Sequence, residues 1–216
     1  MRRNFLKAGL AMALALALTR PALAADDQQQ TVDDSLAALR AMKADTGITK
    51  TGLLRRAKAV LIVPSAVSAA FGIGGTGGRA VLLVRTAHGW SDPAFYSVAS
   101  ASAGFQIGAK EVTSVLLIMT DRALRSFLQD SNVTIGAQAN LTAVRYDVNR
   151  VATLGDADTI LWSKTEGFFA GGAVQAQGFV QNTESDRAYY GRDVNASQIA
   201  AGAVRNRGAD RLRAAL

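Results

Sequence analysis

The sequence predicts an α+β fold with a curved or barrel-like, mainly antiparallel and glycine-rich β-sheet, flanked by N- and C-terminal helices. Apolar residues recur with a helical period near both ends of the chain. Between them lie short β-branched or leucine-rich runs bounded by proline or glycine, which is typical of buried strands. Several of the 20 glycines fall inside these runs, where they mark bulges, bends or close backbone approach.

Two helical segments are expected before the sheet. The first begins at Thr31, which can cap a helix, and ends near Gly47. Its apolar face carries Leu36, Leu39 and Met42. The second, over residues 50–58, is short, amphipathic and basic.

The strand-like segments follow in order after residue 58. The clearer ones are residues 59–63, 80–85, 114–119, 133–145, 159–163 and 168–179, and the weaker, glycine-broken ones are residues 71–75 and 104–108. A helix over residues 121–129 interrupts them. Residues 197–216 return to helix, with a break near Gly208.

The first 24 residues are predicted to be a removable signal peptide. Arg2 and Arg3 precede an apolar stretch over residues 8–18, and Ala22 and Ala24 form a small-residue cleavage pattern. The apolar stretch is well short of the about 20 residues that span a bilayer as a helix. The paired arginines indicate the twin-arginine route, with an ordinary secretory signal as the alternative.

Cleavage near Ala25 would leave a flexible lead over residues 25–35 and a single domain over residues 36–216. Because the signal carries four cations and no acidic residue, its removal lowers the formal charge from +7 to +3. A nucleic-acid partner is therefore not expected. The chain has no cysteine, so disulfides, a thiol nucleophile and a lipidated cysteine are excluded. The expected location is the periplasm, either free or peripheral on a membrane.

Catalytic and metal-binding patterns are weak. His88 is the single histidine, so a histidine metal cluster is excluded and a catalytic triad would have to include this residue. The segment Gly72–Gly77 matches G-x-G-x-x-G, but a strand-like run follows it where a dinucleotide site needs a helix. Asp156 and Asp158 could contact calcium, although such loop aspartates are usually only solvated. We expect no enzyme activity, no cofactor and no metal.

Four cations near the N-terminus form the candidate binding site: Lys50, Arg55, Arg56 and Lys58. A basic helix with a leucine face can lie at an anionic membrane surface. The alternative is that the leucines pack on the core and the charges are solvated. A second basic group in the C-terminal segment has the same two interpretations: Arg205, Arg207, Arg211 and Arg213.

Several separate motifs, in this order and spacing, resemble the SYLF domain family. They lie at residues 59–64, 72–78, 89–96, 104–108, 167–172 and 188–191, and the resemblance covers roughly residues 36–193. The motif positions are Gly72, Gly74, Gly75, Gly77, Gly78, Trp90, Pro93, Phe95, Gly104, Gly108, Gly171, Tyr190 and Gly191. Aromatic residues beside these glycines are expected to fill the core, with contact to acyl chains as the alternative.

The resemblance implies a domain that binds phospholipid, known in eukaryotes for phosphoinositide-containing membranes and association with actin. In a periplasm only general binding of anionic phospholipid carries over. We therefore expect a non-enzymatic, phospholipid-binding envelope protein. The alternatives are a periplasmic scaffold that contacts another envelope protein and, third, a hydrolase.

Overall fold

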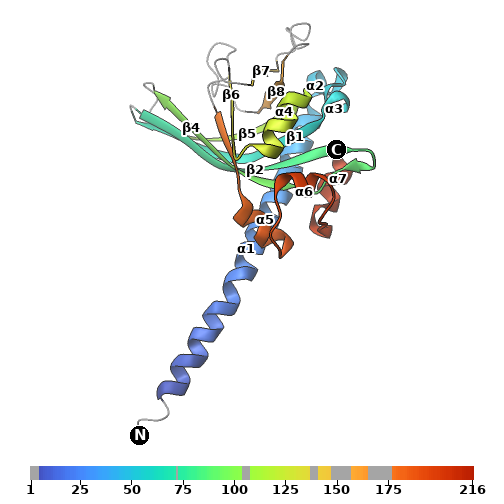
Figure 1. Cartoon of the computed structure of the whole chain (residues 1–216). Coiled ribbons are helices and arrows are strands. Elements are labelled where there is room, and N and C mark those ends of the chain that lie inside the picture. Colours follow the sequence, from blue (N-terminus) through green and yellow to red (C-terminus); the bar gives the residue numbers. More distant parts are fainter. Residues whose placement is uncertain (1–4, 72, 104–107, 137–140, 147–156, 165–176) are drawn as a thin grey trace.

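A computed structural model describes residues 5–71, 73–103, 108–136, 141–146, 157–164 and 177–216. Its centre is a curled β-sheet with strand order β6-β9-β4-β2-β1-β5-β8-β7, and β3 pairs with β2 (Figure 1). The strands are β1 (Ala59–Phe71), β2 (Ile73–Thr86), β3 (Gly89–Trp90), β4 (Ala94–Ala103), β5 (Gly108–Ile118), β6 (Asn132–Ile135), β7 (Ala143–Arg145), β8 (Thr159–Ser163) and β9 (Gln177–Gln181). Only the β7–β8 ladder is parallel among the described strand pairs, which confirms the predicted mainly antiparallel sheet.

Helices from both ends of the chain flank the sheet, as predicted. They are α1 (Phe5–Ala44), α2 (Thr46–Lys50), α3 (Leu53–Arg56), α4 (Asp121–Gln129), α5 (Thr183–Tyr190), α6 (Ala196–Ala200), a 3₁₀ turn at Arg207–Ala209 and α7 (Asp210–Ala215). Figure 1 shows α1 crossing the sheet, where it contacts β1, β2 and β5. The α+β fold class is therefore confirmed.

The sheet carries a hydrophobic core on each face. On the α1 side, Leu36 and Leu39 pack in one cluster with Val60 and Leu83 of the sheet. On the opposite side, Phe127 of α4 packs in a second cluster. Its partners there include Tyr96, Phe179 and Ile199. Burial of these side chains is the main source of the stability of the domain.

The segment predicted as a flexible lead is helical instead, because α1 runs through it without a break. Val32 is buried beneath the helix, and the hydroxyl groups of Thr31 and Ser35 are buried with it. Thr31 Oγ1 donates to the Asp27 carbonyl at 3.0 Å and Ser35 Oγ to the Thr31 carbonyl at 2.7 Å. Polar side chains can be buried when they form hydrogen bonds with the backbone of their own helix. Signal cleavage and the domain limit at residue 36 stay predictions.

The sheet has a β-bulge at Pro64. The sequence pattern predicted bulges or bends at the glycines instead. One extra residue enters β1 between Ile62 and Ser65 relative to β2, and between Val63 and Ala66 relative to β5. Proline has no N–H to donate to a ladder, which suits it to a bulge. The glycines of β2 stay in register with both neighbouring strands.

The predicted close approach of backbones is nevertheless present at Gly78. A Cβ atom added there would lie 2.9 Å from Ala66 Cβ and 2.9 Å from the Ser65 carbonyl oxygen. At Gly77, one residue earlier, nothing lies within 4 Å of such an atom. A side chain would therefore clash at position 78, whereas position 77 has room for one.

Gly78→Ala is expected to lower the free energy of unfolding by about 1–3 kcal/mol, because the added methyl group overpacks against backbone atoms. Urea unfolding at equilibrium measures this change. Gly77→Ala is the matched control and should be neutral or slightly stabilising. Equal destabilisation by both variants would contradict the close approach at Gly78.

Candidate functional site

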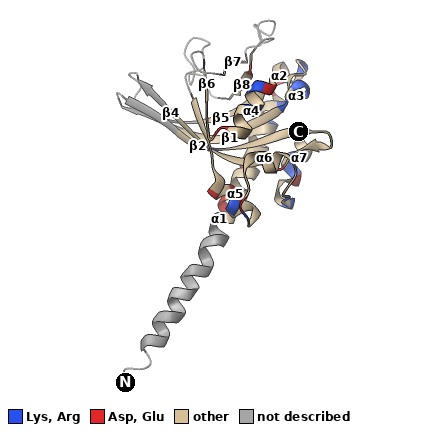
Figure 2. Cartoon of the chain, viewed as in Figure 1, with Lys and Arg blue, Asp and Glu red and all other residues tan. Residues whose placement is uncertain are grey.

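Helices α2 and α3 form one end of the domain, which we call the basic end (Figure 2). Asp45 caps α2 by accepting from the Gly47 N–H at 2.9 Å, and Trp162 Nε1 donates to its other oxygen at 3.0 Å. Gly52 begins α3 with a φ of 68° that favours glycine. The side chains of Ile48 and Leu53 are buried in the core. The apolar face of this segment therefore packs on the protein, as the alternative interpretation expected.

The four predicted cations have different surroundings. Lys50, Arg55 and Arg56 are exposed, and the part of the chain that the structure describes supplies no ion-pair partner for them. Lys58 instead lies 2.9 Å from Asp121 Oδ1, at the start of α4. The structure brings the first three cations to one surface, where Lys58 is paired with an acidic residue.

Arg85 joins the basic end, although the sequence pattern placed it inside a strand and did not single it out. Its guanidinium donates to the carbonyls of Ala57 at 2.9 Å and Leu54 at 2.8 Å. It also lies 4.2 Å from the ring centroid of Trp90, a cation–π contact. Because Arg85 holds the last carbonyls of α3, it positions Arg55 and Arg56 as well as adding charge.

Two of the four cations in the C-terminal basic group contact other parts of the protein. Arg205 pairs with Asp210 at 3.0 Å. Arg213 Nε donates to the Trp90 carbonyl at 2.8 Å, so this side chain fastens α7 to the sheet. Arg207 and Arg211 are exposed. This group therefore offers fewer available cations than the basic end.

The motif residues around Pro93 and Tyr190 meet in space and hold α5 against β4. Tyr190 donates its hydroxyl to the Pro93 carbonyl at 2.6 Å. The Phe95 N–H donates to Asp186 at 2.9 Å, and the Phe95 ring meets Tyr189 edge-on at 5.1 Å. Gly191 ends α5 with a φ of 69°. The aromatic residues here serve the core, as expected.

The other motif positions lie in the sheet or beyond the described residues. Gly74 and Gly75 pair in register within β2, and Gly108 begins β5. Trp90 is buried beside Arg85. Gly72, Gly104 and Gly171 lie outside the described residues. Gly74, Gly75 and Gly77 lie inside β2, which continues as a strand to Thr86, so a strand and not a helix follows these glycines, as the sequence indicated.

Three buried carboxylates make contacts that hold parts of the fold together. Burial raises the pKa of Asp186 to about 7, partly offset by the Phe95 N–H. Burial likewise raises the pKa of Asp92, whose Oδ1 makes no hydrogen bond and lies 3.8 Å from Arg213 Nε. Burial also raises the pKa of Asp158, but hydrogen bonds from Thr142, Thr120 and Arg122 outweigh it, and the net pKa is lowered.

These contacts leave Asp158 little room for a calcium ion, because both oxygens already accept protein hydrogen bonds. Asp156 lies outside the described residues. Across the described ranges no group of three or more acidic or histidine side chains is arranged to hold a metal. His88 lies exposed in the turn between β2 and β3.

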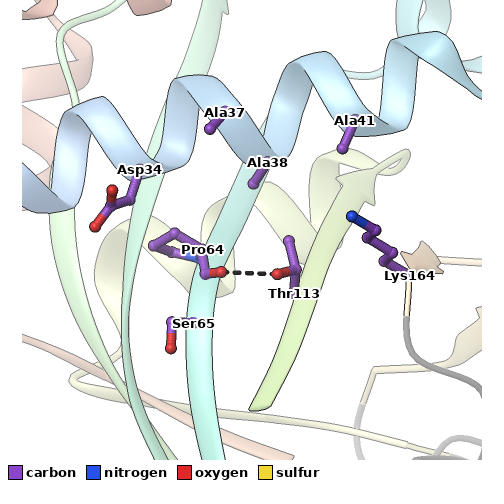
Figure 3. A pocket seen from close by; sticks show the side chains of 8 residues that line it. All are labelled: Asp34, Ala37, Ala38, Ala41, Pro64, Ser65, Thr113 and Lys164. Carbon is purple, nitrogen blue, oxygen red and sulfur yellow. Dashed lines mark hydrogen bonds between the residues drawn. The ribbon is translucent and has the colours of Figure 1, made fainter.

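A groove of about 300 Å³ lies where α1 passes over the Pro64 bulge (Figure 3). Its lining residues are Asp34, Ala37, Ala38, Ala41, Pro64, Ser65, Thr113 and Lys164. Thr113 Oγ1 donates to the Pro64 carbonyl at 2.9 Å, so the bulge keeps a partner. The groove exists because the side chains of Ala37, Ala38 and Ala41 on α1 are too small to fill this space.

No described helix of this chain has the length and apolar character needed to cross a membrane.

Comparison with known proteins places these features in context. The family model Ysc84, described as "Las17-binding protein actin regulator", matches residues 99–216. LAS seventeen-binding protein 3 of Saccharomyces cerevisiae is 29% identical over 159 residues, which are 71% of this chain and 34% of that protein. The SH3 domain-containing YSC84-like protein 1 is 30% identical over 151 residues in Xenopus laevis (67% of this chain, 44% of that protein).

The human YSC84-like protein 1 is similarly 29% identical over 153 residues, 68% of this chain and 44% of that protein. The chain thus spans between a third and a half of the length of these curated relatives. The name of the yeast relative describes a binding protein, and the family description adds that of an actin regulator. The family model begins within β4, so the basic end lies outside its match.

Proposed function

The chain belongs to the Ysc84 family, whose domain is also called SYLF, and on that premise we propose that it is a non-enzymatic phospholipid-binding protein of the cell envelope, associating with anionic membrane lipid. The observation that carries the proposal is the basic end. There Lys50, Arg55 and Arg56 project from two short, well-anchored helices without a described acidic partner. Such a surface is complementary in charge to an anionic bilayer.

The expected strength of this contact follows from the number of available cations. Each Lys or Arg near an anionic leaflet contributes about 1 kcal/mol, and the attraction falls off within a Debye length of about 8–10 Å at moderate salt. Three exposed cations, with Arg85 beside them, therefore support weak and reversible binding that salt suppresses. The buried Ile48 and Leu53 are not available to insert, so this contact is electrostatic.

The envelope location is part of the proposal and rests on the N-terminal sequence. The Arg2-Arg3 pair, the short apolar stretch after it and the Ala22-Leu23-Ala24 pattern support export by the twin-arginine route. A periplasmic protein would meet the anionic phospholipids of the membranes that enclose it.

A scaffold that binds another envelope protein is the second candidate. The names of the yeast relatives give Las17 as a protein that they bind. The same exposed cations could bind an acidic protein surface without lipid. Charge alone does not separate these partners, so the test must use lipid in the absence of other proteins.

The proposal is tested by cosedimentation of the chain from Ala25 onward with vesicles of phosphatidylglycerol or phosphatidylcholine, at low and high salt. We expect binding to phosphatidylglycerol vesicles at low salt, strong loss of that binding at high salt, and little binding to phosphatidylcholine at either. Circular dichroism beforehand verifies that the shortened chain is folded. A folded chain that fails to bind phosphatidylglycerol at low salt would contradict the proposal and favour the scaffold.

A further inference from the structure

The groove over the Pro64 bulge carries opposite charges at its two ends (Figure 3). Asp34 of α1 lies at one end, and Lys164, the residue after β8, lies at the other end beside Ala41. Both charged residues are exposed, and neither forms an ion pair with a residue that the structure describes. An anion and a cation are thus available to a ligand within one hollow.

Each of the two charged residues is anchored by a neighbour. Gln30 Nε2 donates to Asp34 Oδ1 at 2.8 Å, and this bond uses only one of the two carboxylate oxygens. The Lys164 N–H donates to the Thr113 carbonyl at 3.2 Å, which ties the backbone at this residue to β5. A ligand would therefore meet groups whose positions the fold already restricts, and this lowers the entropy cost of binding.

The groove is short and narrow. Its α1 wall runs from Asp34 to Ala41, and a helix advances about 10 Å over these seven residues. Its volume of about 300 Å³ lies at the lower limit of the range of ligand sites, which is about 300–1,000 Å³. A ligand that reaches both charges must therefore be slender and extended.

The floor of the groove offers hydrogen bonds between the two charges. Thr113 donates its single hydroxyl proton to the Pro64 carbonyl, so its oxygen is left to accept. The half-buried Ser65 hydroxyl has no hydrogen-bond partner among the described residues and can donate or accept. An acceptor and a donor thus lie between the charges, which is what the N–H and C=O groups of a peptide backbone require.

The bulge and the small residues of α1 together create this arrangement. Pro64 stands in the register of neither β2 nor β5, so the floor is irregular at this point. On the opposite wall, Ala37 and Ala41 present only methyl groups. Because a methyl group extends no farther than Cβ, the backbone of a ligand can lie close to the helix.

These features indicate an extended peptide segment as the occupant. In a polyproline II helix, residues three apart lie on the same side, and three residues advance about 9 Å, which matches the α1 wall. Such a segment has no internal hydrogen bonds, so its backbone groups can bond with Ser65 and Thr113. An acyl chain, in contrast, has no group that could pair with either charge or either hydroxyl.

We propose that this groove binds an extended segment of a partner protein, in which a Lys or Arg pairs with Asp34 and an Asp or Glu three residues away pairs with Lys164. Small residues or proline lie between them, against the alanines of α1. The inference goes beyond the proposed lipid binding and does not rest on it, because the groove shares no residue with the basic end.

Three peptides that differ only in charge test the groove: Lys-Pro-Ala-Glu, Lys-Pro-Ala-Lys and Glu-Pro-Ala-Glu, each with blocked ends. They are titrated into the ¹⁵N-labelled full chain, and amide chemical shifts report binding. We expect saturable shifts at Ala38, Ser65 and Lys164 with millimolar Lys-Pro-Ala-Glu. The other two peptides should bind at least about threefold more weakly, because each exposed charge pair contributes only modestly.

Reversal of the charge at one end gives a sharper test. Asp34→Lys puts a cation at both ends of the groove. This variant should therefore prefer Glu-Pro-Ala-Glu over Lys-Pro-Ala-Glu by at least about threefold. A residue that only supported the fold would not exchange one peptide preference for another.

A matched pair of leucine substitutions tests the position of the peptide. Ala37 and Ala44 are both exposed on α1, but only Ala37 lines the groove. Ala37→Leu should obstruct the groove and weaken binding of Lys-Pro-Ala-Glu by about tenfold or more. Ala44→Leu should bind this peptide as the unaltered chain does.

Three results would overturn the inference. The first is the absence of saturable shifts at the groove, or equal affinity for all three peptides. The second is an Asp34→Lys variant that keeps the original preference. The third is a response of the same amides to soluble dihexanoyl phosphatidylethanolamine and not to the peptides, which would assign the groove to a zwitterionic lipid. Vesicle binding by the basic end is measured separately, so the two proposals can fail independently.

Discussion

Reversing two charges at the basic end, with Arg55→Glu and Arg56→Glu together, is expected to weaken binding to phosphatidylglycerol vesicles by roughly 10²- to 10³-fold at low salt. Each cation contributes about 1 kcal/mol near an anionic surface, and each introduced anion opposes binding by a similar amount. The sum of about 4 kcal/mol corresponds to nearly three powers of ten in the dissociation constant. Vesicle titration followed by sedimentation measures the loss.

The matched control has the same change in net charge at another surface. Arg192 and Arg211 are both exposed, near α5 and in α7, and have no ion pair with a described residue. Arg192→Glu with Arg211→Glu should weaken binding far less than the Arg55 and Arg56 pair. Equal losses would mean that net charge controls binding and that the basic end has no special role.

The fold was predictable wherever local pattern and long-range pairing agree. The helix Asp121–Gln129 and the strand Thr159–Ser163 have the predicted bounds. Strand β4 was missed because its sequence is rich in alanine and serine, and its pairing with β2 and β9 stabilises it. Helix α5 was missed because it is short and polar. Asn182 caps it, accepting from the Ser185 N–H at 2.9 Å.

The candidate site was predictable only as a list of cations. The sequence contains Lys50, Arg55 and Arg56 but cannot show that Asp121, more than sixty residues away, pairs with Lys58. Nor can it show that Arg85, at the end of β2, folds back onto the carbonyls of α3. Charge pairing and capping between distant segments depend on the tertiary fold, and no local pattern encodes them.

The second large effect concerns Asp186, whose carboxylate is buried where α5 meets β4 and is 1% exposed. Burial raises its pKa from 3.8 to about 7 in the folded state, against a partial opposing effect of the Phe95 N–H. Because the folded pKa lies above the unfolded value, the folded state binds a proton more readily. The carboxylate therefore costs nothing below about pH 4, and its cost grows as pH rises to about 7, reaching up to about 4 kcal/mol.

Asp186→Asn should remove this cost while its amide oxygen still accepts from the Phe95 N–H. The variant is expected to unfold at about the same urea concentration as the wild type at pH 4 and at a clearly higher one at pH 8. Asp92 and Asp158 also have shifted pKa values but are unchanged in the variant, so the difference between the two proteins isolates Asp186.

Asp186→Ala distinguishes the effect of the carboxylate charge on stability from the effect of its hydrogen bond with the Phe95 N–H. It removes the acceptor of the buried Phe95 N–H, which costs about 1–3 kcal/mol, and so should be less stable than Asp186→Asn by that amount at every pH. If Asp186→Asn instead lost stability between pH 4 and pH 8 as steeply as the wild type, the carboxylate would not be the source of the pH dependence. The contact between α5 and β4 would then accommodate an ionised Asp186 with no loss of folding free energy. The burial of this carboxylate argues against that result.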